Sequence, residues 1–278
     1  MQFIWQIAVD AFRRFNDNEG WAIASHIALS ALMALFPFLI FVTAMAASLF
    51  GSRELADETA RILLETWPDV IADPIAAEIR NVMSGLPGDA LTFAVLIAIF
   101  FASSGIESLR IGLDRAYGVR EGRAWWLLRI ESVAYVVVGG AALLVLSFLV
   151  VLYPLMWASV IRYATWFERF GQFLEFVRLG AAAAVLIVAL LVAHWWLPAG
   201  RRKFRDILPG ALVTMALWLG AGMVFGRYLA SFAYTYVTYY AGLASVMAAL
   251  VFLYLVAMIF IYGAELNASI SRARKKGR

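Results

Sequence analysis

The chain has 278 residues, of which 64% are hydrophobic and only 15% charged. Soluble domains have roughly a quarter of their residues charged, so this composition excludes an ordinary soluble protein. The absence of cysteine excludes disulfides, thiolate metal sites and thiol catalysis. The formal net charge of +4 would suggest nucleic acid as a partner of a soluble protein. Here the basic residues flank long apolar segments, so we expect no nucleic-acid partner.

Six long windows contain no Asp, Glu, Lys or Arg: residues 20–52, 90–106, 132–161, 179–200, 207–226 and 228–264. A bilayer core about 30 Å thick is crossed by roughly 20 apolar helical residues. Continuous apolar runs also differ from the alternating segments of a membrane barrel. We therefore predict an all-α membrane protein, a single domain over residues 1–278 with six transmembrane helices and short interfacial amphipathic helices. The predicted spans are 27–50, 90–107, 133–157, 179–198, 207–226 and 243–264.

The distribution of basic residues predicts the orientation. The amino-terminal segment, the second and fourth connections and the tail at 272–278 hold 16 of the 23 Lys and Arg residues. The positive-inside rule then places both termini and the basic tail in the cytoplasm. We interpret the tail and the basic cluster at 201–205 as anchors for anionic lipid, so membrane lipids are the expected partners.

The first element is predicted as an amphipathic helix on the inner membrane surface. Phe3, Ile7, Ala11 and Phe15 recur at helical spacing. A signal peptide would instead place basic residues before a short apolar core and a cleavage site. We therefore expect this segment to be retained.

The first two spans each carry a local signal. Pro37 lies inside the first span, where a missing backbone hydrogen bond predicts a kink that serves either as a static packing feature or as a hinge. The connection at 51–89 predicts two short helices on the outer face with an acidic surface. After the second span, Glu107, Arg110 and Asp114 follow at i+3 and i+4 spacing, which predicts a helix that continues past the membrane with intrahelical ion pairs.

The later spans carry glycine and aromatic patterns. Gly222 and Gly226 have the small-xxx-small spacing that allows helices to pack closely, either within the bundle or in a homo-oligomer. An aromatic stripe precedes the last span and predicts an interfacial helix, with an aromatic lining for a lipid-like ligand as the alternative. The stripe consists of Tyr228, Phe232, Tyr236 and Tyr240.

Several sequence blocks together resemble a known family. They are Ala28-Leu29-Ser30-Ala31-Leu32 with Phe36-Pro37, Leu208-Pro209-Gly210-Ala211, Trp218, Arg227-Tyr228-Leu229, Tyr240-Ala241-Gly242-Leu243 and Gly263-Ala264-Glu265-Leu266-Asn267-Ala268. With the order and spacing of six spans, the chain resembles the YihY/BrkB family of bacterial inner-membrane proteins. The resemblance implies a multi-pass protein of the bacterial inner (plasma) membrane linked to envelope integrity. It further implies either transport of lipid-like molecules or the ribonuclease label that members have carried.

The residues argue against an enzyme. Metal-dependent RNA cleavage requires clustered His, Asp or Glu ligands in an aqueous pocket. The chain has two histidines, His26 and His194, on different spans, and neither has a second ligand at metal-binding spacing. We therefore expect no catalytic residues, no metal and no cofactor. The chain also lacks a nucleotide-binding Gly-x4-Gly-Lys-Ser/Thr loop.

Polar residues near the cytoplasmic ends of the spans are the candidate functional residues. Ionisable groups inside or beside the bilayer are costly and often functional. The predicted topology places one set on the same side, where it permits a cytoplasm-facing polar cavity: Glu265, Asn267, Glu107, Arg110, Asp114 and His26. Transport of lipid-like or amphipathic molecules is the leading interpretation. A non-transporting scaffold or envelope-assembly factor is the alternative.

Overall fold

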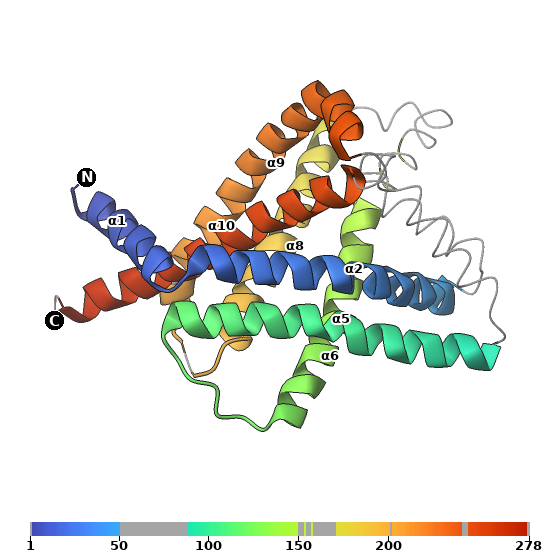
Figure 1. Cartoon of the computed structure of the whole chain (residues 1–278), viewed down its shortest axis with the longest axis horizontal. Coiled ribbons are helices and arrows are strands. Elements are labelled where there is room, and N and C mark those ends of the chain that lie inside the picture. The colour runs from blue at the N-terminus through green and yellow to red at the C-terminus, as the bar shows by residue number, and fades with distance from the viewer. Residues whose placement is uncertain are drawn as a thin grey trace. The chain divides into compact units, whose positions relative to one another are not determined.

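Every element of the described structure is a helix. The computed structural model describes residues 2–50, 88–149, 153, 157, 171–200, 202–240 and 244–276, and no strand occurs among them. The helices are α1 (Gln2–Asp17), α2 (Gly20–Phe50), α5 (Gly88–Tyr117), α6 (Trp125–Ser147), α8 (Gly171–Trp196), α9 (Phe204–Tyr240) and α10 (Ala244–Lys276) (Figure 1). The all-α prediction is confirmed, and each of the six predicted spans overlaps a described helix.

The described helices have the dimensions and surface of membrane spans. Five segments are long and apolar enough to cross a bilayer: Val95–Tyr117, Trp125–Ser147, Gly171–Trp196, Phe204–Leu229 and Val246–Lys275. A shorter apolar segment, Gly20–Leu35, begins the 31-residue helix α2. Large apolar side chains face outward, as Phe176 (77% exposed) and Val224 (68%) illustrate, whereas Glu265 and Asn267 are fully buried. A lipid solvent favours this arrangement, so the chain is a multi-pass membrane protein.

The chain divides into two units. Unit 1 comprises Met1–Leu35, Ala102–Ser132 and Leu190–Arg278, and unit 2 comprises Phe36–Phe101 and Val133–Ala189. The chain passes between the units inside α2, α5, α6 and α8, and the passage in α2 lies beside Pro37. The single-domain and hinge interpretations stay predictions. All the polar residues proposed as a site belong to unit 1.

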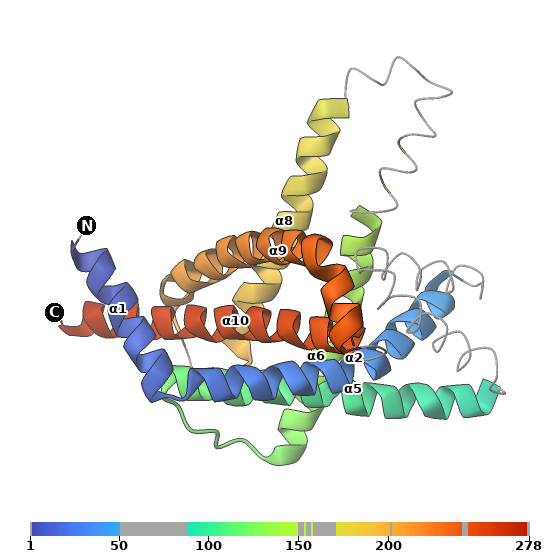
Figure 2. The same cartoon turned by 45° about the horizontal axis from the view of Figure 1, so that its top comes forward.

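Within unit 1, α10 is the central helix. It lies beside α9, and α1 crosses it near its carboxyl end (Figures 1 and 2). Gly210 of α9 and Gly263 of α10 allow the close approach, because a Cβ at Gly210 would collide with the Gly263 carbonyl and a Cβ at Gly263 with Thr214. A Cβ at Gly222 or Gly226 would meet no described atom within 4 Å. The close crossing of α9 and α10 therefore lies at Gly210, near the start of α9, and not at Gly222 or Gly226 further along that helix.

The amino-terminal helix forms as predicted, and part of its apolar face packs on protein. Ala11 and Phe15 are buried, and Phe15 packs edge to face against Trp21 with ring centroids 5.0 Å apart. The apolar face at this end of α1 is thus covered by protein, since α1 packs on α10. The predicted amphipathic helix is present, and its position on the inner membrane surface stays a prediction.

Two other predicted elements are only partly visible. Helix α9 runs without interruption to Tyr240, so the aromatic stripe continues the helix of the fifth span. Tyr228 is exposed, whereas the side chains of Phe232, Tyr236 and Tyr240 lie outside the described residues. The two helices predicted in the connection at 51–89 also fall outside them, since the described part of that connection is Gly88 and Asp89 at the start of α5. The interfacial location of the stripe stays a prediction.

Candidate functional site

Asn267 joins the helices of unit 1 in one buried network. Its Oδ1 accepts a hydrogen bond from the backbone N–H of Gly210 at 2.7 Å, and its Nδ2 donates to the Tyr117 hydroxyl at 3.3 Å. That hydroxyl lies 3.1 Å from Nδ1 of His194. Asn267 and His194 are both fully buried. The Asn267 amide and the Tyr117 phenol therefore connect four segments. These are the ends of α5 and α8 and the adjoining turns of α9 and α10.

His194 continues this network into an aromatic stack. Its ring stacks on Phe260 at 4.7 Å between centroids, and Phe260 stacks on Trp218 at 6.3 Å. The indole N–H of Trp218 donates to the Val256 carbonyl at 3.0 Å. The histidine thus serves as a packed ring with one polar neighbour, which is a structural role.

A loop before α9 closes over the end of α5. The Asp114 carboxylate accepts a hydrogen bond from the Ala199 N–H at 2.7 Å. The Arg202 guanidinium lies 4.2 Å above the Tyr117 ring and donates to the Ala199 carbonyl at 2.6 Å. Burial lowers the pKa of Arg202 below its ordinary value, an effect that the nearby Tyr117 and Asp114 oppose.

The predicted ladder of Glu107, Arg110 and Asp114 does not form. Glu107 pairs with Arg129 of α6 at 2.9 Å, and Arg110 donates to the Leu128 carbonyl at 3.0 Å and to Ser132 Oγ at 2.7 Å. An intrahelical pair contributes only roughly 0.2–0.5 kcal/mol. Leaving a buried polar group unpaired costs about 1–3 kcal/mol, so tertiary partners prevail for the buried Arg110.

The turn between α5 and α6 contains a second ion-pair cluster. Arg123 pairs with Glu121 at 2.6 Å and with Glu131 at 2.7 Å, and it donates to the Leu197 carbonyl at 3.2 Å. The hydrogen bonds from Arg123 lower the pKa of Glu121 to about 2, despite its partial burial. They likewise raise the pKa of Arg123. This cluster fixes the turn to the loop that follows α8.

Glu265 lies on another face of α10. Asn18, in the turn between α1 and α2, donates to its Oε1 at 2.6 Å. Glu265 is fully buried, and its Oε2 has no hydrogen-bond partner among the described residues. Arg14 and Arg272 are near enough to attract the carboxylate electrostatically. The hydrogen-bond donor to Glu265 is thus the neutral amide of Asn18, and the two arginines act on the carboxylate only through their charge.

The remaining histidine stands apart. His26 is exposed, with Nε2 3.5 Å from the Ser108 hydroxyl. In the described part of the chain, no three His, Asp or Glu side chains are grouped so that they could hold a metal ion.

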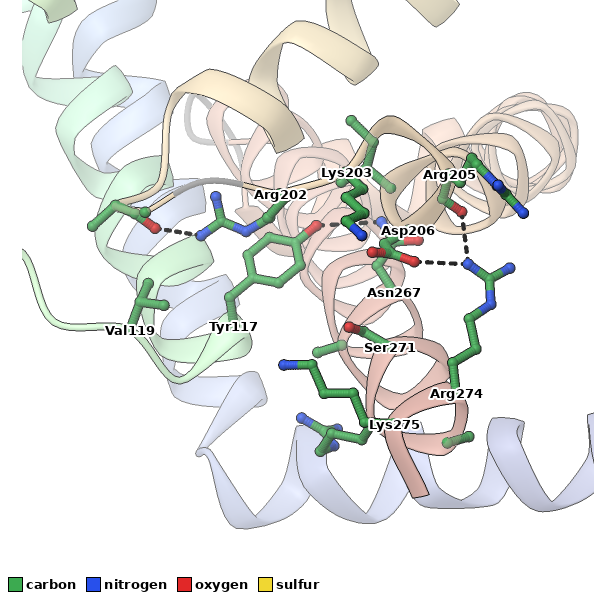
Figure 3. A pocket seen from close by; sticks show the side chains of 16 residues that line it. Tyr117, Val119, Arg202, Lys203, Arg205, Asp206, Asn267, Ser271, Arg274 and Lys275 are labelled. Carbon is green, nitrogen blue, oxygen red and sulfur yellow. Dashed lines mark hydrogen bonds and ion pairs between the residues drawn. The ribbon is translucent and has the colours of Figure 1, made fainter. Parts of the chain in front are cut away.

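A basic cavity of about 840 Å³ opens beside the Asn267 network (Figure 3). Tyr117 and Asn267 belong to its lining, and Arg274 pairs across it with Asp206 at 2.7 Å. Among the predicted members, Asn267 lines this space, whereas Asp114 reaches only its wall through Ala199. Glu107 and Arg110, Glu265, and His26 are not among the lining residues of this cavity. The shared cytoplasm-facing cavity stays a prediction.

Three contributors to the site are absent from the residues that the sequence predicts. Tyr117 has no predicted role, and the sequence predicts Arg202 only as a lipid anchor. Asn18 carried no signal, since its partner is 247 residues away in the sequence. Asn267 is the predicted cavity residue that lines this space, and the basic cluster at 201–205 is a sequence signal for its positive charge.

Comparisons with known proteins identify the family. The model of the family described as virulence factor BrkB matches residues 11–278. A Bacillus subtilis protein named as ribonuclease-like, YfkH, is 24% identical over 270 residues, covering 96% of this chain and 95% of the relative. A UPF0761 membrane protein of Rhodospirillum centenum is 25% identical over 95% of this chain, and one of Xanthomonas campestris is 24% identical over 98%. This chain spans 57% and 61% of the length of those two relatives. No solved structure matches. The chain belongs to the virulence factor BrkB family of multi-pass membrane proteins.

Proposed function

We propose that the protein moves lipid-like, amphipathic molecules between the leaflets of the bacterial inner membrane, with both termini in the cytoplasm. The observation that carries the proposal is Glu265. This carboxyl group is fully buried in an apolar spanning helix and keeps one oxygen without a hydrogen-bond partner among the described residues. Ionisable groups in such places are costly and are retained mainly for function.

The surroundings of Glu265 support this assignment. Arg272, which attracts the Glu265 carboxylate, also lines the basic cavity. Arg272 is therefore a neighbour of both the buried carboxyl group and the charged cavity. This arrangement suits a cargo with a polar head, because polar side chains would replace part of the head's hydration.

The proposal includes no ribonuclease activity. His194 is fully buried against Phe260 and Tyr117, and His26 is an exposed residue whose polar neighbour is Ser108. An acid–base pair for RNA cleavage requires two such groups within reach of one phosphate. The two histidines belong to separate surroundings, which favours a non-enzymatic protein.

The test is lipid exchange between the leaflets of proteoliposomes. We expect the wild-type chain to accelerate loss of a fluorescent lipid signal to an external quencher, compared with empty vesicles. Glu265→Gln should slow the exchange, whereas Asp17→Asn, which neutralises an exposed carboxylate, should not. Wild-type exchange no faster than that of empty vesicles would overturn the proposal.

A scaffold function is the second candidate, favoured by the open glycines of α9. No described atom lies within 4 Å of a Cβ added at Gly222 or Gly226, and such small residues let a helix of a partner or a second copy approach closely. A scaffold should lose function in Gly222→Leu and tolerate Glu265→Gln. A transporter should show the opposite sensitivity in a cellular assay of envelope integrity, at matched protein levels.

A further inference from the structure

The basic cavity has more positive charge than its own side chains neutralise. Its cations come from the loop after α8, the start of α9 and the end of α10: Arg202, Lys203, Arg205, Arg272, Arg274 and Lys275. Asp206 is the acidic side chain in the described lining, and its partner is Arg274. Arg272 is also paired, since its guanidinium lies 3.7 Å from the Asp10 carboxylate of α1. Lys203 and Lys275 are exposed and form no side-chain pair within the described residues. The cavity therefore presents surplus positive charge from a concave surface.

An apolar groove of about 450 Å³ adjoins this cavity. It lies among α1, α9 and α10, and its walls include Ile7, Val213, Leu266 and Ile270. Arg274 lines the groove and the basic cavity alike. The two spaces follow neighbouring stripes of α10, since residues 266, 270 and 274 border the groove and residues 267, 271 and 275 border the cavity. A charged space and an apolar space thus meet at one arginine.

We propose that unit 1 binds an anionic phospholipid, with the phosphate in the basic cavity and an acyl chain in the apolar groove. This assignment names the class of molecule that the proposed function would move, and the lipid's role as cargo rests on that proposed function. Arginine guanidinium groups bind phosphate oxygens in bidentate geometry, and lysines add point charges. Basic pockets between membrane helices recognise the headgroups of anionic lipids in this way.

The groove selects a lipid over a free anion. Inorganic phosphate would satisfy the cations but would leave the adjoining groove to unconnected apolar molecules. A lipid fills both spaces with one molecule, because its acyl chain is covalently joined to its phosphate. A zwitterionic lipid would place its own cation among the cavity's six, which disfavours it.

Displacement of radiolabelled lysophosphatidate from the purified full chain in neutral detergent tests the proposal. Unlabelled lysophosphatidate should compete about tenfold or more better than lysophosphatidylcholine or inorganic phosphate, because only it supplies both the charge and the chain. Lys203→Gln/Lys275→Gln should weaken binding about fivefold or more. Both lysines are exposed, so the variant should fold, and size-exclusion chromatography checks this. Arg13→Gln, which removes an exposed cation of α1 that does not line the cavity, should change binding less than about twofold.

A second variant tests the groove. Ala8→Trp adds a large side chain to its wall on α1. It should weaken binding of lysophosphatidate and leave the weak competition by inorganic phosphate unchanged.

Three results would overturn the proposal. These are equal competition by lysophosphatidylcholine, equal competition by inorganic phosphate, and wild-type affinity in the double lysine variant. Failure of the transport proposal and failure of the lipid-site proposal can be distinguished by comparing binding with leaflet exchange. Selective lysophosphatidate binding without leaflet exchange would remove the transport function and keep the lipid site, whereas exchange without selective binding would remove the site alone.

Discussion

Glu265 and Asn267 lie two residues apart on α10, are equally buried and are held in different ways. The amide of Asn267 uses its oxygen on Gly210 and its nitrogen on Tyr117. The carboxyl group of Glu265 has one hydrogen bond, from Asn18, and an oxygen without a partner among the described residues. The two residues are therefore alike in burial and differ in how completely their polar atoms are hydrogen-bonded.

The two residues also face different surroundings. Asn267 points to the crossing where Gly210 and Gly263 bring α9 and α10 together. Glu265 points to the turn between α1 and α2, which contributes a single neutral donor. We interpret the first region as a fixed joint and the second as the place where an ionisable group remains available for function.

A substitution at Gly263 should destabilise the crossing of α9 and α10 the most. A Cβ there collides with the Thr214 hydroxyl and lies 3.1 Å from the Gly210 carbonyl. We expect Gly263→Ala to lower the free energy of unfolding by about 3 kcal/mol, since overpacking forces the helices apart. Unfolding in mixed micelles measures this, with Gly222→Ala as the matched control in open space. Equal stability of the two alanine variants would refute the close crossing.

Asn267→Leu should have the next largest effect. The substitution keeps the volume similar but leaves the Gly210 N–H without its acceptor in a buried place. We expect a loss of about 2 kcal/mol in the free energy of unfolding. Asn267→Asp, which restores the acceptor for Gly210 but not the donor for Tyr117, should recover part of it. No loss in Asn267→Leu would contradict the structural role of the amide.

The sequence predicted the helices well because the membrane constrains them strongly. Charge-free windows can be recognised without any knowledge of tertiary contacts, and all six spans predicted from them overlap described helices. The spacing of Ala11 and Phe15 likewise predicted α1 correctly, although it could not distinguish a lipid surface from the surface of α10. An apolar face has the same pattern whichever apolar partner it meets.

The site was less accessible because its partners are chosen by tertiary packing. Glu107 and Arg110 had local partners at helical spacing, yet residues of α6 bind them instead. Gly222 and Gly226 had the spacing of a packing motif, but a spacing does not state whether a helix lies opposite. Arg202 illustrates the same limit, since a basic residue beside a span fits a lipid anchor and a cavity wall equally well.

The acid sensitivity of the α5–α6 turn gives a smaller effect. Hydrogen bonding to Arg123 lowers the pKa of Glu121 from 4.5 in the reference state to about 2. The depressed pKa means that the stabilisation is fully present above about pH 4.5 and is lost as the pH falls towards 2. We expect Glu121→Gln to cost about 1 kcal/mol at neutral pH.

Melting curves in detergent from pH 7 to 2 check this expectation. The wild-type Tm should fall more steeply than that of the variant below about pH 4.5, because only the wild type loses an ionised Glu121 there. Parallel curves over that range would contradict the assignment of the ion pair. Arg120→Gln, an exposed substitution in the same turn, is the control.

Glu265→Gln should change stability least, within about 1 kcal/mol of the wild type. The glutamine oxygen keeps the hydrogen bond from Asn18, and the loss of an ionisable group from a buried place offsets the amide nitrogen that takes the position of Oε2. Unfolding in mixed micelles, beside Asn267→Leu, measures the difference between the two neighbours on α10. A fall as large as that of Asn267→Leu would give both residues the same structural role, and it would remove the observation on which the transport proposal rests.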